Sequence, residues 1–378
     1  MARRAAGEAG RDPGPGEAEL RRYAEWYGRY FDEHARRSAE PLTKLDPLPR
    51  VLLARGLGAF TIGKTLDEAR IAGDVYGHTA RVIADAMAIG RYAPVSHADL
   101  FDVEYWSLEQ AKLKVGKSNA GALARRIALV TGAARGIGRA TAEHFLELGA
   151  HVVLSDANEP ALAETVAVLA QRAGRRISAE VADVTRPEDC ERLVDAAVAA
   201  FGGLDIVVSN AGNAPSGLLH TREGEAALHR SLELNFLSHQ HVARAACDVL
   251  LAQGTGGCLL FNASKSAFNP GKEFGPYAIP KAAVVALTRQ YAVDLGAHGI
   301  RANAVNADRI RTALFDGIVE ARAKARGVSP DEYFRDNLLR RETTAGDVAR
   351  AFGYLATAEA TTGAVITVDG GNAAAFPR

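Results

Sequence analysis

The clearest pattern of hydrophobic and polar positions begins at Arg126 and continues through the rest of the 378-residue chain. Short apolar runs rich in β-branched residues alternate there with longer stretches in which apolar residues recur at helical spacing. Runs that are apolar at nearly every position indicate strands buried on both faces, as in a parallel sheet covered by helices. The strand candidates are RIALVTG, HVVLSD, ISAEVADV, LDIVVSNAG, GCLLFNAS, IRANAVNA and AVITVDGG. The pattern therefore predicts an α/β fold with a doubly wound parallel sheet of about seven strands over residues 119–378.

The residues before this region follow a different pattern. Residues 1–18 are rich in Ala, Gly, Pro and Arg and have no apolar face, so we expect a disordered tail. Residues 19–118 contain two stretches of helical periodicity, at 19–37 and 66–90, around a short apolar run that starts at Pro49. We expect a smaller α/β unit there. The basic, small-residue segment KVGKSNAGALARR fits a connector between the two units.

Composition limits the classes of partner. The chain has 45 basic and 45 acidic residues, so no positive excess favours a nucleic acid or an anionic membrane. No run of about 18 apolar residues predicts a membrane span, and no apolar core of a secretory signal follows the N-terminal arginines. Three scattered cysteines are too few for a disulfide framework. We therefore expect a cytoplasmic protein that acts on a small molecule, without a nucleic-acid or membrane partner.

A glycine-rich turn joins the first strand of the large region to a helix. In IALVTGAARGIGRA, Gly132, Gly136 and Gly138 form a G-x-x-x-G-x-G pattern between a predicted strand and a predicted helix. Glycines let the backbone approach a pyrophosphate, and the helix start offers free N–H groups and its positive end to phosphate. The glycines alone are a weak signal, but their place between strand and helix makes the pattern typical of a Rossmann-type dinucleotide site.

The next strand ends in Asp156, eighteen positions after Gly138. A carboxylate there can accept hydrogen bonds from the adenosine ribose hydroxyls and repels a 2′-phosphate, which favours NAD. The alternative is a carboxylate that caps the following helix. Arg135 in the glycine loop favours the phosphorylated cofactor instead. Because Arg135 is expected to be flexible and solvated, we predict NAD.

Tyr277 and Lys281 are four positions apart, so on a helix they share one face. Tyrosine has a reference pKa near 10 and is a poor base at neutral pH. A lysine ammonium about 4 Å away contributes about 4 kcal/mol at an effective dielectric constant of about 20. That corresponds to about three pKa units, enough to bring the phenol near the working pH. Pro280 is tolerated near a helix start, which places Tyr277 in the first turn.

With these motifs in their order, the region resembles the short-chain dehydrogenase/reductase family. The resemblance rests on TGAARGIG at 131–138, Asp183, NAG at 210–212, Asn235, Ser264, YAIPK at 277–281 and VDGG at 368–371. It implies a catalytic set of Asn235, Ser264, Tyr277 and Lys281. It implies a cofactor site formed by Gly132, Arg135, Gly136, Ile137, Gly138, Asp156, Asp183, Val184, Asn210, Ala211, Gly212, Tyr277, Lys281, Ile310 and Thr312.

In this set, Ser264 would polarise the substrate oxygen and Asn235 would hold a water behind Lys281, which also holds the nicotinamide ribose. Lys265 and Ser266 are neighbours of Ser264, and spacing alone assigns the role to Ser264. The resemblance also implies a homodimer or homotetramer.

The sequence departs from the family pattern after the sixth strand. Ala307-Asp308 stands where the family usually has Pro-Gly, although Thr312 keeps its place. Asp308, Arg309 and Arg311 put three charges on the loop over the substrate. They are either a solvated cluster or an arginine clamp for an anionic or polyhydroxylated substrate. Residues 313–343 predict a helical lid.

Residues 48–90 resemble the end of a class II sugar-phosphate aldolase domain. In that family a zinc-binding histidine precedes the glycine that aligns with Gly58, but this chain has Leu57, and no paired histidines occur in residues 1–56. The whole arrangement resembles the back half of bifunctional rhamnulose-1-phosphate aldolase/short-chain dehydrogenase proteins, with a degenerate aldolase part. That resemblance implies a small sugar-derived substrate, and it leaves open the role of residues 1–118.

One further pattern invites a metal interpretation. His239 and His241 form an H-x-H in a helical stretch, where residues two apart do not face the same way, so we expect surface or packing histidines and no metal. Three functions are compatible with the sequence: an NAD-dependent sugar or alcohol dehydrogenase, a cofactor-binding but inactive scaffold, and an aldolase. The complete Tyr–Lys–Ser–Asn set favours the first.

Overall fold

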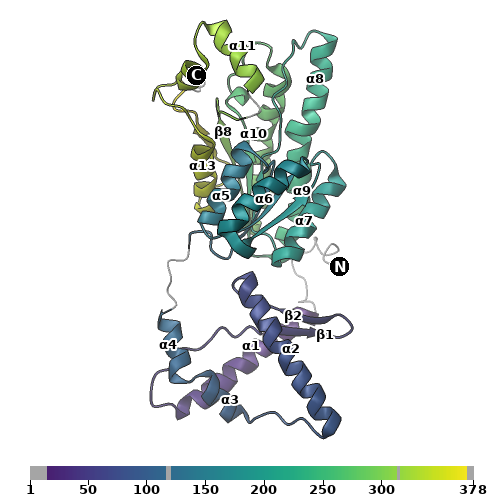
Figure 1. The fold of residues 1–378 in the computed structure, drawn as a ribbon, viewed down its shortest axis with the longest axis vertical. Helices are drawn as coiled ribbons and strands as arrows, with labels where there is room; N and C mark the ends of the chain where they lie inside the picture. Colours follow the sequence, from purple (N-terminus) through teal and green to yellow (C-terminus); the bar gives the residue numbers. More distant parts are fainter. Residues whose placement is uncertain (1–14, 116–120, 313–315, 373–378) are drawn as a thin grey trace. The chain divides into compact units, whose positions relative to one another are not determined.

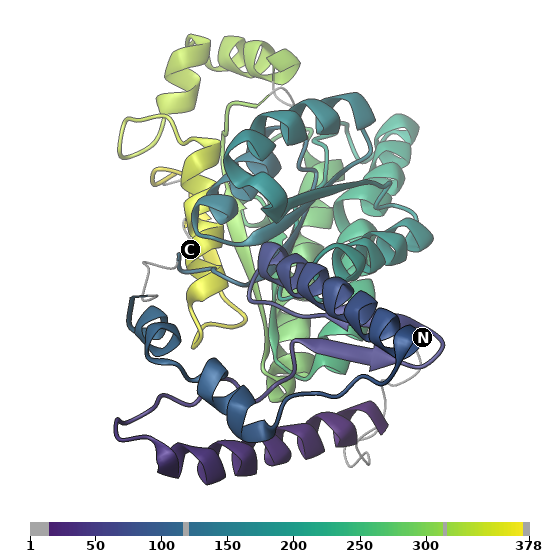
Figure 2. The ribbon, with the colours of Figure 1, turned by 60° about the horizontal axis from the view of Figure 1, so that its bottom comes forward.

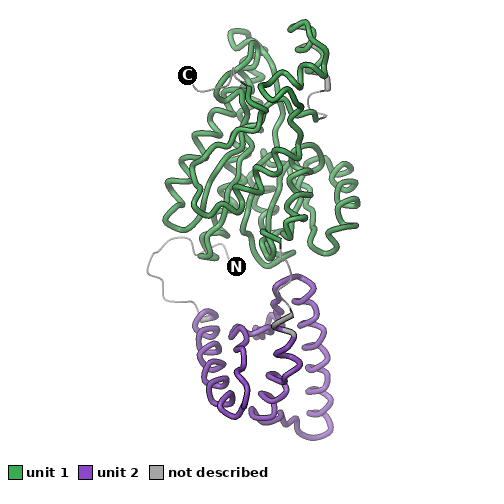
Figure 3. The backbone as a smooth tube through the Cα atoms, turned by 90° about the vertical axis from the view of Figure 1, so that its left-hand side faces the viewer, with its two compact units in different colours: residues 1–6, 121–378 green, residues 7–120 purple. Residues whose placement is uncertain are grey.

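The computed structural model describes residues 15–115, 121–312 and 316–372. The described residues divide into two compact units, one within residues 15–115 and one within residues 121–372 (Figures 1 and 3). Each unit has its own hydrophobic cluster and is described by itself.

The unit that follows the connection is built on one seven-stranded sheet in which all neighbours are parallel. Its order is β5-β4-β3-β6-β7-β8-β9. The strands are β3 (Ile127–Thr131), β4 (His151–Asp156), β5 (Ile177–Val181), β6 (Ile206–Ser209), β7 (Gly257–Asn262), β8 (Ile300–Ala307) and β9 (Val365–Val368). Each lies within one of the seven apolar runs, so the α/β, Rossmann-type fold is confirmed.

Helices cover both faces of this sheet (Figures 1 and 2). Successive side chains of a strand point to opposite faces, and in β3 Val130 joins one core cluster while Leu129 joins the other. The first cluster includes α5 (Gly136–Glu147), α6 (Glu159–Ala173) and α13 (Ala345–Thr357). The second includes α7 (Pro187–Phe201), α9 (Ser238–Gln253) and α10 (Gly275–Leu295). Burial on both faces explains why the strands carry so few polar residues.

The strand order reverses at β3, which lies between β4 and β6. The chain leaves β3 toward β4 and β5 on one side and returns to β6 on the other. Connections on opposite faces open a crevice at the carboxyl ends of these strands, where ligands bind in open α/β sheets. The remaining elements near that edge are α8 (Arg222–Leu232), a π-helical segment (Glu233–Leu237), α11 (Asp316–Arg326) and α12 (Pro330–Arg335).

The smaller unit contains α1 (Pro15–His34), the antiparallel pair β1 (Val51–Ala54) and β2 (Gly58–Thr61), α2 (Leu66–Ile89), α3 (His97–Glu104) and α4 (Ser107–Val115). Its core is a cluster of aromatic side chains, Tyr27, Tyr30, Phe101 and Tyr105. The predicted tail is too long, because α1 begins at Pro15, a residue type favoured in a first helical turn. The rest of that predicted tail, residues 1–14, lies outside the described residues.

Leu57 lies in the turn between β1 and β2, and its side chain is 76% exposed. It has no atom that can ligate zinc. Over the part of the chain that the structure describes, no helix is both long enough and apolar enough to cross a membrane.

Candidate active site

In the glycine turn after β3, backbone segments lie too close together to leave room for side chains. Gly132 and Gly136 have φ angles of 63° and 56°, in the left-handed region that favours glycine. A Cβ atom on Gly138 would lie 2.1 Å from the carbonyl oxygen of Gly132. Only glycine therefore lets α5 start this close to the end of β3, with its free N–H groups facing the crevice.

Asp156 is the last residue of β4 and lies beside this turn. Its Oδ2 atom accepts from the backbone N–H of Ala134 at 3.1 Å, and its Oδ1 atom accepts from that of Asn158 at 2.9 Å. The helix cap expected as an alternative role belongs to Asn158, whose side chain accepts from the N–H of Ala161. Asp156 thus ties the glycine loop to β4 and keeps a negative charge at the edge of the crevice. Arg135 is exposed.

A cavity of about 1030 Å³ extends from the glycine turn to the start of α10. Small-molecule sites commonly occupy about 300–1,000 Å³, so this cavity is large enough for more than one small ligand. All the cofactor and catalytic residues expected from the sequence line it except Gly138, which is buried below the turn. They are Gly132, Arg135, Gly136, Ile137, Asp156, Asp183, Val184, Asn210, Ala211, Gly212, Asn235, Ser264, Tyr277, Lys281, Ile310 and Thr312.

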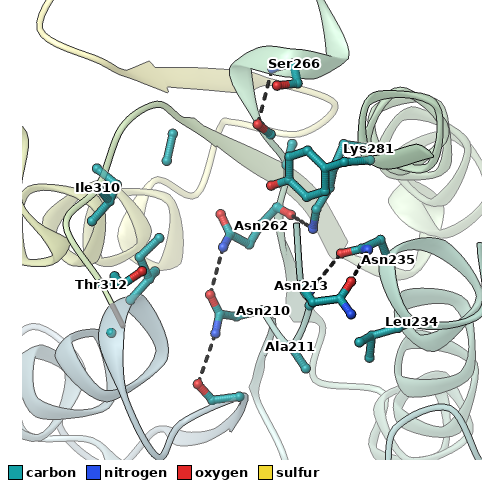
Figure 4. A pocket seen from close by; sticks show the side chains of 18 of the residues that line it. Asn210, Ala211, Asn213, Leu234, Asn235, Asn262, Ser266, Lys281, Ile310 and Thr312 are labelled. Carbon is teal, nitrogen blue, oxygen red and sulfur yellow. Dashed lines mark hydrogen bonds between the residues drawn. The ribbon is translucent and has the colours of Figure 1, made fainter. Parts of the chain in front are cut away.

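Tyr277 and Lys281 line the cavity from the first two turns of α10. Figure 4 shows Lys281 in this cavity. Pro276 lies in the first turn and Pro280 follows Tyr277, so the expected position of the tyrosine near the helix start is correct. The Lys281 side chain is buried, and its Nζ atom donates to the carbonyl oxygen of Asn262 at 2.8 Å. The same Nζ atom lies 5.9 Å from the centre of the Tyr277 ring.

The pKa values of this pair differ from the sequence-based expectation. Burial lowers the pKa of Lys281 to about 7. Burial also raises the pKa of Tyr277, and hydrogen bonding from Ser264 opposes that rise only in part. The expected lowering of the phenol pKa by Lys281 is therefore wrong for this structure, because the simple charge–charge argument left out the desolvation of both groups.

Ser264 follows β7 and caps the short 3-10 turn Lys265–Ala267. Its Oγ atom accepts from the backbone N–H of Ser266 at 3.2 Å. The hydrogen bond with Ser264 that acts on the Tyr277 phenol places these two hydroxyls together. Ser264, rather than Ser266, is therefore the serine that faces the tyrosine.

Asn235 lies in the π-helical segment between α8 and α9, where such bulges often mark functional sites. Its amide nitrogen donates to Asn213 and to Ser231, and its Oδ1 atom accepts from the backbone N–H of Asn213. A Cβ atom on Gly212 would lie 2.7 Å from Asn235 Oδ1 and 3.6 Å from Lys281 Nζ. Asn235 and Lys281 thus border the same small space.

Two residues that sequence reasoning did not select join this network. The Asn262 side chain donates to Asn210 at 2.8 Å, so hydrogen bonds run from the glycine turn through Asn210 and Asn262 to Lys281 (Figure 4). His239 is completely buried, with Nε2 3.3 Å from Lys281 Nζ and Nδ1 2.7 Å from Ser209 Oγ. The expectation of a packing histidine holds for His239, but its neighbour is the active-site lysine. In the sequence, His239 lies four positions after Asn235, a spacing that places two residues on one helix face, and this spacing could have indicated its place in the site.

The charged loop after β8 differs from both interpretations of the sequence. The Arg309 side chain is only 10% exposed, and it donates to the carbonyl oxygens of Tyr333 and Asp336 and to the Asp336 carboxylate. Arg311 pairs with Asp331 and Glu342. These arginines are paired with the lid segment rather than free in solvent, and Arg309 also lines the cavity. The predicted helical lid is present in part, as α11 and α12, because residues 336–343 are not helical and 313–315 lie outside the described residues.

A glycine turn at the switch point of a doubly wound sheet, facing the same cavity as a Tyr–Lys pair, defines a Rossmann-fold oxidoreductase. Residues 132–373 match the sequence family described as enoyl-(acyl carrier protein) reductase, and residues 13–113 match the second domain of class II aldolases. The chain belongs to the short-chain dehydrogenase/reductase family, with an aldolase-like region in front.

Individual relatives agree with this assignment. The chain is 36% identical to (+)-borneol dehydrogenase 1 of Salvia officinalis over 259 residues, which cover 67% of this chain and 95% of that protein. It is 35% identical over 343 residues to the uncharacterized oxidoreductase YuxG of Bacillus subtilis, covering 87% of this chain but only 49% of YuxG. Among solved structures, a short-chain type dehydrogenase/reductase from Mycobacterium ulcerans superposes with a TM-score of 0.59 at 32% identity, covering 65% of this chain and 89% of that chain. Levodione reductase superposes at 0.60 with 26% identity, covering 66% and 98%.

Proposed function

We propose that this chain is an NAD-dependent dehydrogenase that transfers a hydride between NAD and a small sugar-derived alcohol, hydroxyaldehyde or ketone. The observation that carries the proposal is the convergence of Tyr277, Lys281 and Ser264 on one end of a cavity whose other end is the glycine turn. A site for proton transfer and a site for a dinucleotide would thus share one cavity.

The residues at the glycine turn fit a dinucleotide. Gly138 lets α5 start directly against the Gly132 carbonyl, where any Cβ atom would clash, and the N-terminus of α5 faces the cavity with free N–H groups. Two buried polar atoms on the cavity wall, Asn262 Oδ1 and Ser155 Oγ, have no hydrogen-bond partner among the described residues. Asp156 would accept from the adenosine ribose, and Thr312, close to Gly136, would contact the nicotinamide end.

Nicotinamide, when bound, supplies or accepts the hydride. Tyr277 exchanges a proton with the substrate oxygen, and Ser264 donates a hydrogen bond to that oxygen. Because burial raises the pKa of Tyr277, the phenol is protonated at neutral pH and ready to act as the acid in carbonyl reduction. Alcohol oxidation requires the phenolate, so its rate should increase with pH. Lys281, held by Asn262 and His239, provides the positive charge beside the phenol.

The sugar-derived substrate class is supported by the aldolase-like region in front of the dehydrogenase unit. The 343-residue match to YuxG is long enough to extend into that region. Two alternatives make different predictions. An inactive scaffold would bind NAD without turnover, and an aldolase would cleave sugar phosphates in a metal-dependent reaction. The intact Tyr277–Lys281 pair argues against the first, and Leu57 argues against the second.

The test is a change in absorbance at the reduced-nicotinamide band with a panel of sugars, lactaldehyde and polyols, assayed in both directions. We expect turnover of at least one small hydroxy compound with NAD. NAD binding without turnover of any panel member would favour the scaffold, and chelator-sensitive cleavage of a sugar phosphate would favour the aldolase.

A further inference from the structure

The substrate end of the cavity is lined by several cations. Lys265, Arg309, Arg322 and Arg326 all border the space in front of Tyr277. Two of them already have carboxylate partners, because Arg309 and Arg326 share Asp336 at 3.0 and 3.3 Å. For Lys265 and Arg322, no ion pair with a carboxylate exists among the residues that the structure describes. These two charges are therefore available to a ligand.

The first of these two cations, Lys265, lies next to Ser264 of the active site. It directly follows Ser264, is half-buried, and makes one long hydrogen bond of 3.4 Å from its Nζ atom to the carbonyl oxygen of Asn269. Burial lowers the pKa of Lys265, and the nearby charges of Arg309, Arg326 and Arg322 lower it further while Asp308 raises it. The Asp308 carboxylate accepts a hydrogen bond from the Asn372 side chain and lies 3.6 Å from the Arg309 guanidinium. Its negative charge is therefore shared with groups other than Lys265.

Arg322 reaches the catalytic tyrosine through one aromatic ring. Its guanidinium carbon lies 4.0 Å from the centre of the Phe274 ring, and that ring lies 4.9 Å from the ring of Tyr277. A guanidinium stacked on an aromatic face keeps the N–H groups at its edge free to bind a planar anion. Burial raises the pKa of Tyr277, and the charge of Arg322 opposes that rise in part, which fits a location near the reacting atoms.

We propose that Lys265 and Arg322 form an anion subsite that binds a carboxylate or a phosphate group of the substrate beside the carbon that reacts at Tyr277. This inference rests on the proposed function and specifies its substrate class, a sugar acid or a sugar phosphate rather than a neutral polyol. Two partly desolvated cations without a protein counter-ion are stabilised when an anion enters, and charge-assisted hydrogen bonds provide the selectivity.

The test compares three ketones that share one HOCH2–CO– group: dihydroxyacetone, hydroxypyruvate and dihydroxyacetone phosphate. Their affinities are measured by calorimetry on the full chain saturated with oxidised NAD, which has no hydride to give to the ketone. We expect hydroxypyruvate or dihydroxyacetone phosphate to bind about 10- to 100-fold more tightly than dihydroxyacetone, the range of a charged hydrogen bond. The stronger of the two identifies the anion as carboxylate or phosphate.

The variants Lys265→Gln and Arg322→Gln should each reduce that preference about tenfold or more while NAD affinity is unchanged. The matched control is Arg289→Gln, an exposed arginine of α10 that does not line the cavity. Equal affinity for the three ketones, no measurable binding of either anionic ketone, or a preference that survives in both variants would overturn the subsite. A preference that depends on both residues without turnover of any substrate would leave the subsite standing and refute the dehydrogenase.

Discussion

The Nε2 atom of His239 lies 3.3 Å from the Nζ atom of Lys281, and the Nδ1 atom of the same ring lies 2.7 Å from Ser209 Oγ. Burial and the charge of Lys281 hold the pKa of His239 well below its usual value, so the imidazole is neutral. If Nδ1 carries the proton and donates to Ser209, Nε2 is the acceptor for the lysine. His239 is thereby a positioning residue for Lys281.

Replacing His239 should move the pH dependence of NAD binding. His239→Leu removes an acceptor of the Lys281 ammonium, so the pKa of Lys281 should decrease further below about 7. The charged lysine is the stronger donor to the nicotinamide ribose, so we expect NAD affinity to decrease with rising pH at a pH about one unit lower than in the unaltered protein. His239→Gln, which keeps an acceptor, should move this pH less. An unchanged pH dependence of NAD affinity in His239→Leu with normal folding would show that the histidine only fills space.

Cofactor choice should depend on the charge of Asp156. We expect the unaltered protein to bind NAD more tightly than NADP in fluorescence titrations. Asp156→Asn removes the charge and keeps one of the two acceptor oxygens, so only one of the hydrogen bonds from the backbone N–H groups of Ala134 and Asn158 is retained. It should reduce the preference for NAD about tenfold, or about 1.4 kcal/mol. Asp156→Ala should also reduce the preference for NAD over NADP, and it should weaken the binding of both cofactors. Equal or tighter NADP binding by the unaltered protein would contradict the assignment.

The glycine turn should not tolerate a single methyl group. In Gly138→Ala the new Cβ atom would lie 2.1 Å from the Gly132 carbonyl oxygen and 2.7 Å from Asn210 Nδ2, so α5 must move away from β3. We expect loss of NAD binding and a decrease in unfolding free energy of about 3 kcal/mol, as for severe overpacking. In the matched control, Gly296→Ala, nothing lies within 4 Å of the new atom, and both properties should stay near normal. NAD binding at normal strength by Gly138→Ala would contradict the tight turn.

The burial of Lys281 should decrease the free energy of unfolding by an amount that depends on pH. Its pKa is about 7 in the folded protein against an ordinary value of 10.5. Between these two values the unfolded chain binds more protons than the folded chain, so the stability of the unaltered protein increases with pH relative to Lys281→Met. We expect the difference in unfolding free energy between them to change by on the order of 3 kcal/mol from pH 7 to pH 10. Parallel stability curves would show that Lys281 is not desolvated.

The sheet could be predicted from the sequence because strands buried on both faces leave an unambiguous apolar pattern, as in IALVT of β3. Gly132, Asp156, Tyr277 and Lys281 could be predicted because each is local to a strand end, a turn or one helix face. The roles of Asn262 and His239 could not, because they depend on β6, β7, α9 and α10 meeting in space. The raised pKa of Tyr277 was missed for a related reason, since desolvation depends on everything packed around the phenol.

The central claim is that Tyr277 exchanges the proton and Lys281 supports it. Tyr277→Phe removes one hydroxyl, so NAD affinity should be retained while turnover of the substrate found in the panel decreases by about two to four orders of magnitude. Lys281→Ala should decrease turnover and also weaken NAD binding, because it removes a contact to the nicotinamide ribose. The most direct measurement is therefore the turnover of Tyr277→Phe beside its NAD affinity. Normal affinity with a loss of at least about a hundredfold is the predicted result, and near-normal turnover would contradict the account.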